Sequence, residues 1–183
     1  MSESIATPAE VLAFWWTAGP DKWFNKDDAF DAELRARFLP TYQAAAAGQL
    51  AAWEATAEGA LALLLVLDQF SRNMFRRDPR AYAADALARS IAARAIEHGF
   101  DQEYPLLQRR FFYLPFEHSE DMADQERSVA LVRASGDEEG LPFAIDHAEI
   151  IRRFGRFPHR NAVLGRATTA EEQAFLDAGG FAG

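Results

Sequence analysis

The sequence contains no cysteine among its 183 residues. This absence excludes disulfide bonds, thiolate nucleophiles and cysteine-ligated zinc sites. A glycine-rich phosphate loop and a GxSxG nucleophile elbow are missing as well, so neither nucleotide binding by a P-loop nor serine-hydrolase chemistry is indicated. The sequence therefore names no reaction through a short catalytic motif.

Long apolar runs and an excess of basic residues are also missing. The longest strongly apolar run, residues 60–67, is far shorter than the roughly 20 residues that cross a bilayer. The formal net charge is -9 and the sequence pI is about 4.9, which disfavours nucleic-acid binding because that binding needs a basic surface. The N-terminus has no basic segment ahead of its apolar residues, so we expect a cytoplasmic protein without a secretory signal.

What the chain does have is the composition of a globular domain. Hydrophobic residues make up 49% and aromatic residues 13% of the sequence, which favours one densely packed domain over residues 1–183. Strand signals are weak because β-branched residues are scarce and alternating apolar runs are missing. The sequence therefore predicts an all-α fold.

Helix boundaries can be placed from local signals. Thr7 and Glu10 form a capping box for a helix that ends near Ala18. A second capping box, Thr169 with Glu172, opens a short C-terminal helix. The sequence predicts further helices over about 57–75, 80–98, 119–134 and 141–154, a helix that Pro40 kinks or restarts, and a short one broken by Pro115.

Short connections between these helices predict an array of antiparallel helical hairpins. Hairpins of this length are typical of tetratricopeptide-like superhelices, but no position-by-position repeat is present in the sequence. We therefore expect a superhelix without regular repeats.

Polar residues interrupt the apolar pattern at the end of the helix predicted over 57–75. Asp68 lies four residues before Arg72, and Gln69 lies four residues before Asn73, so each pair shares a helix face. Four polar groups beside a buried segment need partners if they are buried, which favours a pocket. The alternative is an exposed polar helix end with one ion pair.

Two further blocks contain histidine. In the block over 113–125, Ser119 suits a helix N-cap, while His118 and Glu120 could be solvated or face a site, and Gln125 shares an apolar stripe. In the helix over 141–154, His147 points inward, where it is either a core group or a site residue. Glu149 can pair with Arg153.

Metal binding by these histidines is not expected. Histidine and glutamate two positions apart on a helix point in different directions, and no HExxH or paired Glu-x-x-His set is present. The sequence predicts no metal site and indicates no cofactor.

The fifteen residues RRFGRFPHRNAVLGR, 152–166, form the most basic stretch of this acidic chain. Gly155 is expected to end the preceding helix in a left-handed conformation. Arg152 and Arg166 look like ordinary surface charges. The residues that need a partner are the remaining polar ones: Arg153, Arg156, His159, Arg160 and Asn161.

The segments LDQFSRNMFR, LPFEHSEDMADQ and RFGRFPHRNAVLGR, in this order, resemble the bacterial family called domain of unknown function 924. The resemblance covers essentially the whole chain, and it implies an all-helical fold grouped with tetratricopeptide-like superhelices but no established activity. The family pattern matches this chain at these positions: Asp68, Gln69, Arg72, Asn73, His118, Ser119, Glu120, Gln125, His147, Arg153, Gly155, Arg156, Pro158, His159, Arg160 and Asn161. An N-terminal aromatic group also fits the pattern: Phe14, Trp15, Trp16, Trp23 and Phe24.

Three functions remain open at this point. The first is a pocket for a small polar or anionic ligand, in which His118 or His159 moves a proton and Asp68 or Glu120 orients the histidine. Its ligand-binding residues would be Gln69, Arg72, Asn73, Gln125, His147, Arg153, Arg156, Arg160 and Asn161. The second is a peptide- or protein-binding helical module. The third is a purely structural polar network, and the oligomeric state is not indicated by the sequence.

Overall fold

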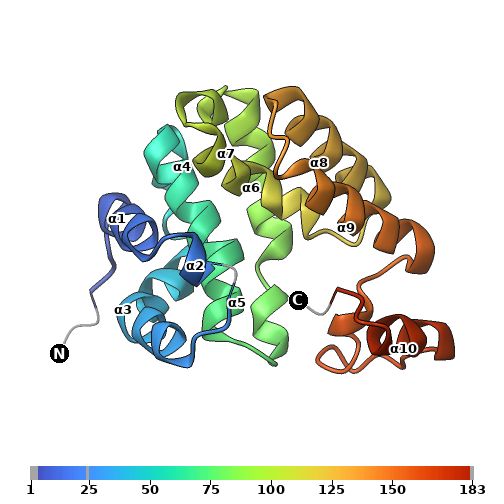
Figure 1. Ribbon diagram of the computed structural model, residues 1–183. Helices are drawn as coiled ribbons and strands as arrows, with labels where there is room; N and C mark the ends of the chain where they lie inside the picture. The colour runs from blue at the N-terminus through green and yellow to red at the C-terminus, as the bar shows by residue number, and fades with distance from the viewer. Residues whose placement is uncertain (1–3, 24, 182–183) are drawn as a thin grey trace. The chain divides into compact units, whose positions relative to one another are not determined.

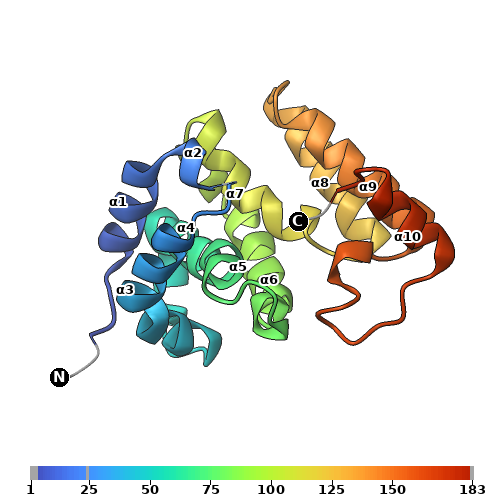
Figure 2. The same cartoon turned by 60° about the horizontal axis from the view of Figure 1, so that its bottom comes forward.

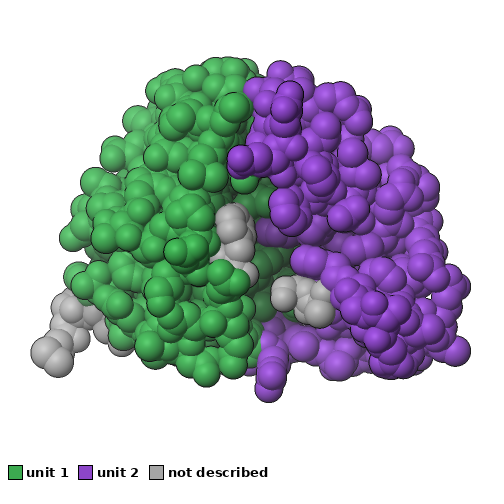
Figure 3. All heavy atoms as spheres, in the orientation of Figure 1, with its two compact units in different colours: residues 1–76, 80–115 green, residues 77–79, 116–183 purple. Residues whose placement is uncertain are grey.

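The computed structural model describes residues 4–23 and 25–181, and every regular element among them is a helix (Figure 1). The predicted all-α class is confirmed. The chain divides into two compact units (Figure 3). Unit 1 contains the residues up to 76 and residues 80–115, and unit 2 contains residues 77–79 and those from 116 onwards.

Unit 1 is built around a buried central helix. Its α-helices are α1 (Pro8–Ala18), α2 (Pro20–Trp23), α3 (Asp28–Ala46), α4 (Ala57–Leu64), α5 (Ser71–Met74), α6 (Asp85–Glu97) and the first part of α7 (Leu106–Glu117). The helix α4 contacts both α1 and α6, and Leu61, Leu64 and Leu67 are fully buried. The continuous apolar run thus forms the core that the sequence predicts.

The helix predicted over 57–75 contains a π-helical segment, η2 (Leu65–Phe70), between α4 and α5. The sequence pattern did not predict this segment, which contains Asp68 and Gln69. Inserted π-turns are rare and are frequent at functional sites. Here the π-turn ends at Phe70, and Ser71 then places its hydroxyl 2.8 Å from the carbonyl of Leu67.

The N-terminal aromatic residues pack inside unit 1. The rings of Trp15 and Trp23 stack with centroids 5.8 Å apart, and Trp23 Nε1 donates a hydrogen bond to the Trp15 carbonyl at 2.7 Å. Trp15 also contacts Phe70 and Phe111. These rings are therefore part of the unit 1 core, and Phe24 lies outside the described residues.

Two predicted helix boundaries in unit 1 are wrong. The helix expected to start at Arg80 begins at Asp85, after a 3-10 turn η3 (Pro79–Tyr82), where the Ser71 hydroxyl lies 3.1 Å from the Ala81 carbonyl. The helix expected to break at Pro115 continues to Glu117. A proline in a helix costs about 3 kcal/mol, and burial of Phe112 and Phe116 on either side of it offsets this cost.

Unit 2 contains α8 (Met122–Ser135), α9 (Leu141–Phe154), the 3-10 turn η5 (Pro158–Arg160) and α10 (Ala170–Asp177). The helices α8 and α9 lie side by side as an antiparallel hairpin (Figure 1 and Figure 2). Asp121, not Ser119, is the N-cap of α8 because its carboxylate accepts the amides of Ala123 and Asp124. Ser119 acts just before it and accepts the Asp121 amide.

Local signals at other helix ends are confirmed. Both predicted capping boxes are formed, by Thr7 with Glu10 and by Thr169 with Glu172. Gly155 ends α9 with φ 68°, in the left-handed region that glycine tolerates. Among residues 4–23 and 25–181, the helices are all too short or too polar to span a membrane.

Candidate functional site

The predicted site residues separate between the two units. Unit 1 contains Asp68, Gln69, Arg72 and Asn73, and unit 2 contains the following nine: His118, Glu120, Gln125, His147, Arg153, Arg156, His159, Arg160 and Asn161. That both sets serve one pocket stays a prediction.

In unit 1, Arg72 lies between two carboxylates. Its guanidinium is 3.1 Å from an oxygen of Asp68, which is the predicted pair, and it forms two parallel bonds of 3.1 Å to Asp85. Burial opposes the charge on Arg72, but the two carboxylates outweigh burial and raise its pKa. The forked geometry that suits an anionic ligand is therefore used here by side chains of the protein itself.

The two amide side chains of this block also find partners in unit 1. Gln69 donates to Asp68 Oδ2 at 2.6 Å, and Asn73 donates to Asp31 Oδ1 at 2.7 Å. Asp68 and Gln69 are buried. The block is a polar network in which the side chains of α5 bond to α3, the π-turn and α6.

In unit 2, the basic stretch after α9 is held by an ion pair with α10. Arg156 forms two bonds to Glu172, of 2.6 and 2.9 Å, and Asn161 donates to the same carboxylate at 3.2 Å. Glu172 is buried, and it also accepts the Thr169 amide of its capping box. The bond from Arg156, followed by the backbone bond from Thr169, lowers the pKa of Glu172 to about 2.

A second ion pair joins the start of α8 to the end of the same stretch. Arg166 forms bonds of 2.6 and 2.9 Å to Glu120, and Glu120 also accepts the Phe157 amide at 2.8 Å. Burial alone would raise the pKa of Glu120, but the bonds from Arg166 and Phe157 lower it. The interpretation of Arg166 as an ordinary surface charge is wrong, because it also contacts Asn161 Oδ1 at 3.0 Å.

Arg153 lies at the surface of unit 2. Arg153 pairs with Glu171 at 2.9 Å, and both side chains are more than half exposed. The expected pair of Arg153 with Glu149 is wrong, because Glu149 pairs with Arg152 one turn away. Helical spacing allows both choices, and the position of α10 decides between them.

Three of the four histidines of the chain gather in unit 2, around Phe157. The rings of His118 and His147 lie 6.4 Å apart, and Phe157 lies 5.5 Å from His147 and 5.7 Å from His159. Arg160 places its guanidinium 4.5 Å above the Phe157 ring and donates to the His118 carbonyl at 3.0 Å. We call these residues, His118, His147, Phe157, His159 and Arg160, the histidine cluster.

His147 is held in a defined tautomer. Its Nδ1 lies 2.9 Å from the Phe143 carbonyl, and since a carbonyl can only accept, Nδ1 carries the proton. The carboxylate of Glu117 lies 3.5 Å from the same nitrogen. The inward orientation predicted for His147 is confirmed, because the residue is buried.

One ring nitrogen of His159 is unsatisfied. Its Nδ1 is buried and has no hydrogen-bond partner among the described residues. Burial, followed by the nearby charges of Arg160 and His147, lowers the pKa of His159 to about 3. The imidazole is therefore neutral at physiological pH and keeps one buried ring nitrogen unsatisfied, which is rare in folded proteins.

Gln125 has a structural role in unit 2. It is fully buried, as its apolar stripe predicts, and its amide donates to the carbonyls of Glu117 and Ser119 at 2.6 and 2.7 Å. These carbonyls lie at and just after the end of α7, where intrahelical donors run out. Gln125 thus caps the end of α7.

Metal ligation requires several histidine or carboxylate side chains that meet in one place. Over residues 4–23 and 25–181, no group of three or more histidine, aspartate or glutamate side chains is placed to hold a metal ion. The histidine cluster is an arrangement of imidazole, phenyl and guanidinium groups. Its chemistry is that of hydrogen bonding, proton transfer and contact with rings or anions.

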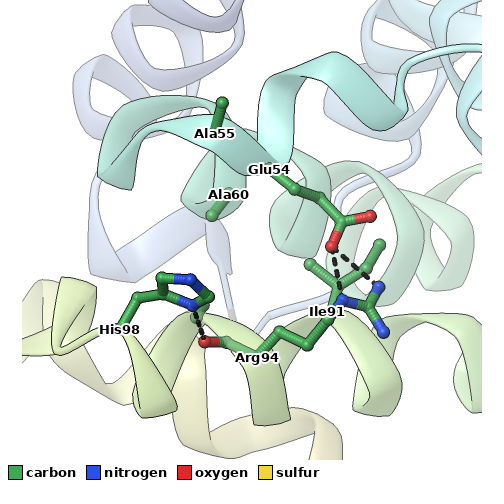
Figure 4. Close-up of a pocket in the computed structure, with 7 residues that line it drawn as sticks. Glu54, Ala55, Ala60, Ile91, Arg94 and His98 are labelled. Carbon is green, nitrogen blue, oxygen red and sulfur yellow. Dashed lines mark hydrogen bonds and ion pairs between the residues drawn. The ribbon is translucent and has the colours of Figure 1, made fainter.

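Unit 1 also contains a cavity of about 250 Å³, away from the predicted blocks (Figure 4). Its lining residues are Glu54, Ala55, Ala60, Ile91, Arg94, Ala95 and His98. Arg94 pairs with Glu54 at 2.7 Å, and its carbonyl lies 2.7 Å from His98 Nδ1 (Figure 4). The charged groups at its rim thus satisfy each other, and the sequence analysis did not single out any of them.

The fold and these polar blocks define a class of all-helical protein in which helix ends are tied by arginine–carboxylate pairs. The family model described as bacterial protein of unknown function (DUF924) matches residues 11–180, and the chain belongs to this family. Similarity to a solved structure agrees: a protein of unknown function from Agrobacterium tumefaciens is 48% identical, with a TM-score of 0.90 over 93% of this chain and 97% of that one. No curated protein matches the chain.

Proposed function

We propose that unit 2 binds a small anionic or polar ligand at the histidine cluster. The observation that carries this proposal is the buried, unpartnered Nδ1 of His159. An unsatisfied buried polar atom costs about 1 to 3 kcal/mol, and proteins retain such costs mainly at functional sites. A ligand that bonds this nitrogen recovers the cost.

The charge around His159 favours an anionic group on the ligand. Arg156 and Arg166 are each neutralised by a carboxylate, Glu172 and Glu120. Burial and, after it, the positive charge of Arg160 lower the pKa of His159. An anion bound beside His159 would oppose this effect and favour the imidazolium, so ligand binding and proton uptake would reinforce each other.

This linkage also makes acid–base chemistry possible at His159 or His118. A neutral imidazole accepts a proton, and its partner anion then stabilises the charged form. We propose the cytoplasm as the location of any such chemistry. In unit 1, Arg72 forms ion pairs with Asp68 and Asp85, and we propose no ligand for these residues.

The test is a thermal-shift screen with named probes: inorganic phosphate, pyrophosphate, acetate, citrate and AMP. A ligand at 100 times its dissociation constant should stabilise the protein by about 2.7 kcal/mol. His159→Phe keeps a planar ring but removes the nitrogen, so it should abolish the shift. Arg153→Ala, which removes an exposed arginine of the same stretch, is the matched control and should leave the shift unchanged.

Native mass spectrometry of the same variants identifies the bound probe. If His159→Phe responds to every probe as the wild-type protein does, the ligand does not use this nitrogen and the proposal is wrong.

A further inference from the structure

The C-terminal segment after α10 places one more aromatic ring on the histidine cluster. The ring of Phe181 lies 4.5 Å from that of His147 and 5.1 Å from that of His159, with Phe157 at 6.5 Å. Phe181 is nevertheless 42% exposed. A phenyl group therefore covers both imidazoles without becoming part of the buried core.

The backbone before Phe181 is shaped to put it there. Gly179 adopts φ 81° and Gly180 follows it, and their amides bond the carbonyls of Leu176 and Phe175 at 3.1 and 3.0 Å. This is the Schellman arrangement at the end of α10. A Cβ at Gly180 would lie 2.5 Å from the Phe175 ring, so the direction of the chain at this point depends on glycine.

From these observations we propose that Phe181 is a tethered occupant of a binding site for an aromatic acid, meaning a flat aromatic ring that carries a carboxylate or phosphate group. The inference rests on the proposed function and names the ligand class of the same site. The ring of such a ligand takes the place of the Phe181 ring against His147 and His159. Its anionic group lies near the unpartnered nitrogen of His159 and the charge of Arg160.

The two halves of this ligand follow from different observations. The ring half follows from the present contacts, since two imidazoles and Phe157 already surround a phenyl group at distances typical of aromatic pairs. The anionic half follows from the buried ring nitrogen of His159 and the neighbouring guanidinium of Arg160. Phe181 provides the aromatic ring but no anionic group.

Competition with a tethered ring reduces the apparent affinity of a ligand to the intrinsic affinity multiplied by the fraction of molecules in which the ring has left the site. Aromatic contacts of this kind contribute about 0.5 to 1.5 kcal/mol. Removing the ring should therefore tighten the binding of an aromatic acid by up to about tenfold. Acetate or inorganic phosphate, which needs no ring site, should gain much less.

The experiment compares wild-type protein with Phe181→Ala, Phe181→Tyr and Phe143→Ala. Phe143 is an exposed ring on α9 of the same unit, 63% exposed, and its removal controls for loss of surface aromatic area. Four probes are titrated by NMR at the histidine side chains: benzoate, phenyl phosphate, acetate and inorganic phosphate. Benzoate and phenyl phosphate distinguish a carboxylate ligand from a phosphate ester.

We expect Phe181→Ala to bind one aromatic probe up to about tenfold more tightly than the wild-type protein, while Phe181→Tyr and Phe143→Ala bind it as wild type does. Equal or weaker binding of both aromatic probes by Phe181→Ala would overturn the inference. In that case the proposed function still stands if His159→Phe abolishes binding of phosphate or acetate. If no variant binds any of the four probes or those of the screen above, both proposals are wrong.

Discussion

Two groups of polar residues lie in unit 2 within the same part of the chain, and they differ in whether their buried polar atoms have hydrogen-bond partners. In the ion-pair network, formed by Glu120, Arg156, Asn161, Arg166 and Glu172, each carboxylate accepts several bonds from side chains and backbone amides. In the histidine cluster, His159 keeps a buried nitrogen without a partner. Residues next to each other in sequence thus serve different ends.

The contrast separates stability from binding. A buried carboxylate with several hydrogen-bond donors stabilises the fold. Removing one of its partners lowers the free energy of unfolding by more than the net contribution of the pair, because a buried charge is left without compensation. A buried group without a partner reduces stability, and for His159 we propose that a role in ligand binding accounts for its retention. Substitutions in the two groups should therefore change the free energy of unfolding in different directions.

The largest effect is expected for Glu172→Ala in the ion-pair network. This change removes the partner of Arg156 and half of the capping box of α10. We expect the free energy of unfolding to fall by about 2 to 3 kcal/mol, since a bond to a charged group contributes about 1.5 to 3 kcal/mol and water replaces part of the remaining bonds at the 27% exposed Arg156 side chain. Urea denaturation measures the change.

The pH dependence of the same residue provides a control. The pKa of Glu172 is about 2 in the folded protein against an ordinary value of 4.5, so its stabilisation is present above pH 4.5 and is lost as the pH falls towards 2. Wild-type stability should decline across this window, and Glu172→Gln should decline less. Parallel curves would show that Glu172 does not stabilise the fold through its charge.

An intermediate effect is expected for Arg166→Ala. Its pair with Glu120 is partly exposed, 23% and 26% for the two side chains, and water replaces some of the lost bonds. A loss of about 1 to 2 kcal/mol is expected, measured by urea denaturation. Arg152→Ala, the surface arginine of the same stretch, is the matched control and should change stability by less than about 0.5 kcal/mol.

Helix ends in this chain could be predicted because their signals are local. Thr7 with Glu10 and Thr169 with Glu172 lie three residues apart, and Gly155 needs only its own backbone conformation. The boundaries near Pro79 and Pro115 could not be placed, because contacts from other parts of the chain override local preference there.

The candidate site was predictable as a set of residues but not as a set of partners. The sequence singled out His118, His147, His159 and Arg160, which meet in unit 2. It could not show that Glu120 pairs with Arg166, 46 residues away. Ion pairs between residues far apart in the sequence have no characteristic spacing, and the chain contains many charges of each sign. The role of Phe181 carried no sequence signal beyond the two glycines before it.

For His159→Phe in the histidine cluster, we do not expect the free energy of unfolding to fall as it does for substitutions in the ion-pair network. Replacing an unsatisfied buried polar group by an apolar ring of similar size is near neutral or stabilising, so at pH 7.5 we expect unchanged or slightly higher stability. The pKa of His159 is about 3 in the folded protein against 6.5 ordinarily. As the pH falls, the unfolded chain therefore takes up the proton at a higher pH than the folded protein does. Wild-type stability should fall as the pH drops from 6.5 towards 3, and His159→Phe should remove that part of the decline.

This pH window lies above that of Glu172, so the two contributions can be separated between pH 6.5 and 4.5. Urea denaturation at several pH values in this interval is the measurement. Marked destabilisation by His159→Phe at pH 7.5 would place His159 with the ion-pair network instead and would contradict the comparison.

The smallest effect is expected for Arg153→Ala, which tests where the ion-pair network ends. Arg153 pairs with Glu171 and lies over the Phe154 ring at 4.6 Å, but its side chain is 53% exposed. Exposed pairs contribute about 0 to 1 kcal/mol and are screened by salt, so a loss below about 0.5 kcal/mol is expected, and less at 0.5 M sodium chloride. A loss as large as that of Arg166→Ala would show that the network continues to the surface of α10, and the contrast with the histidine cluster would then concern the whole stretch rather than its buried part.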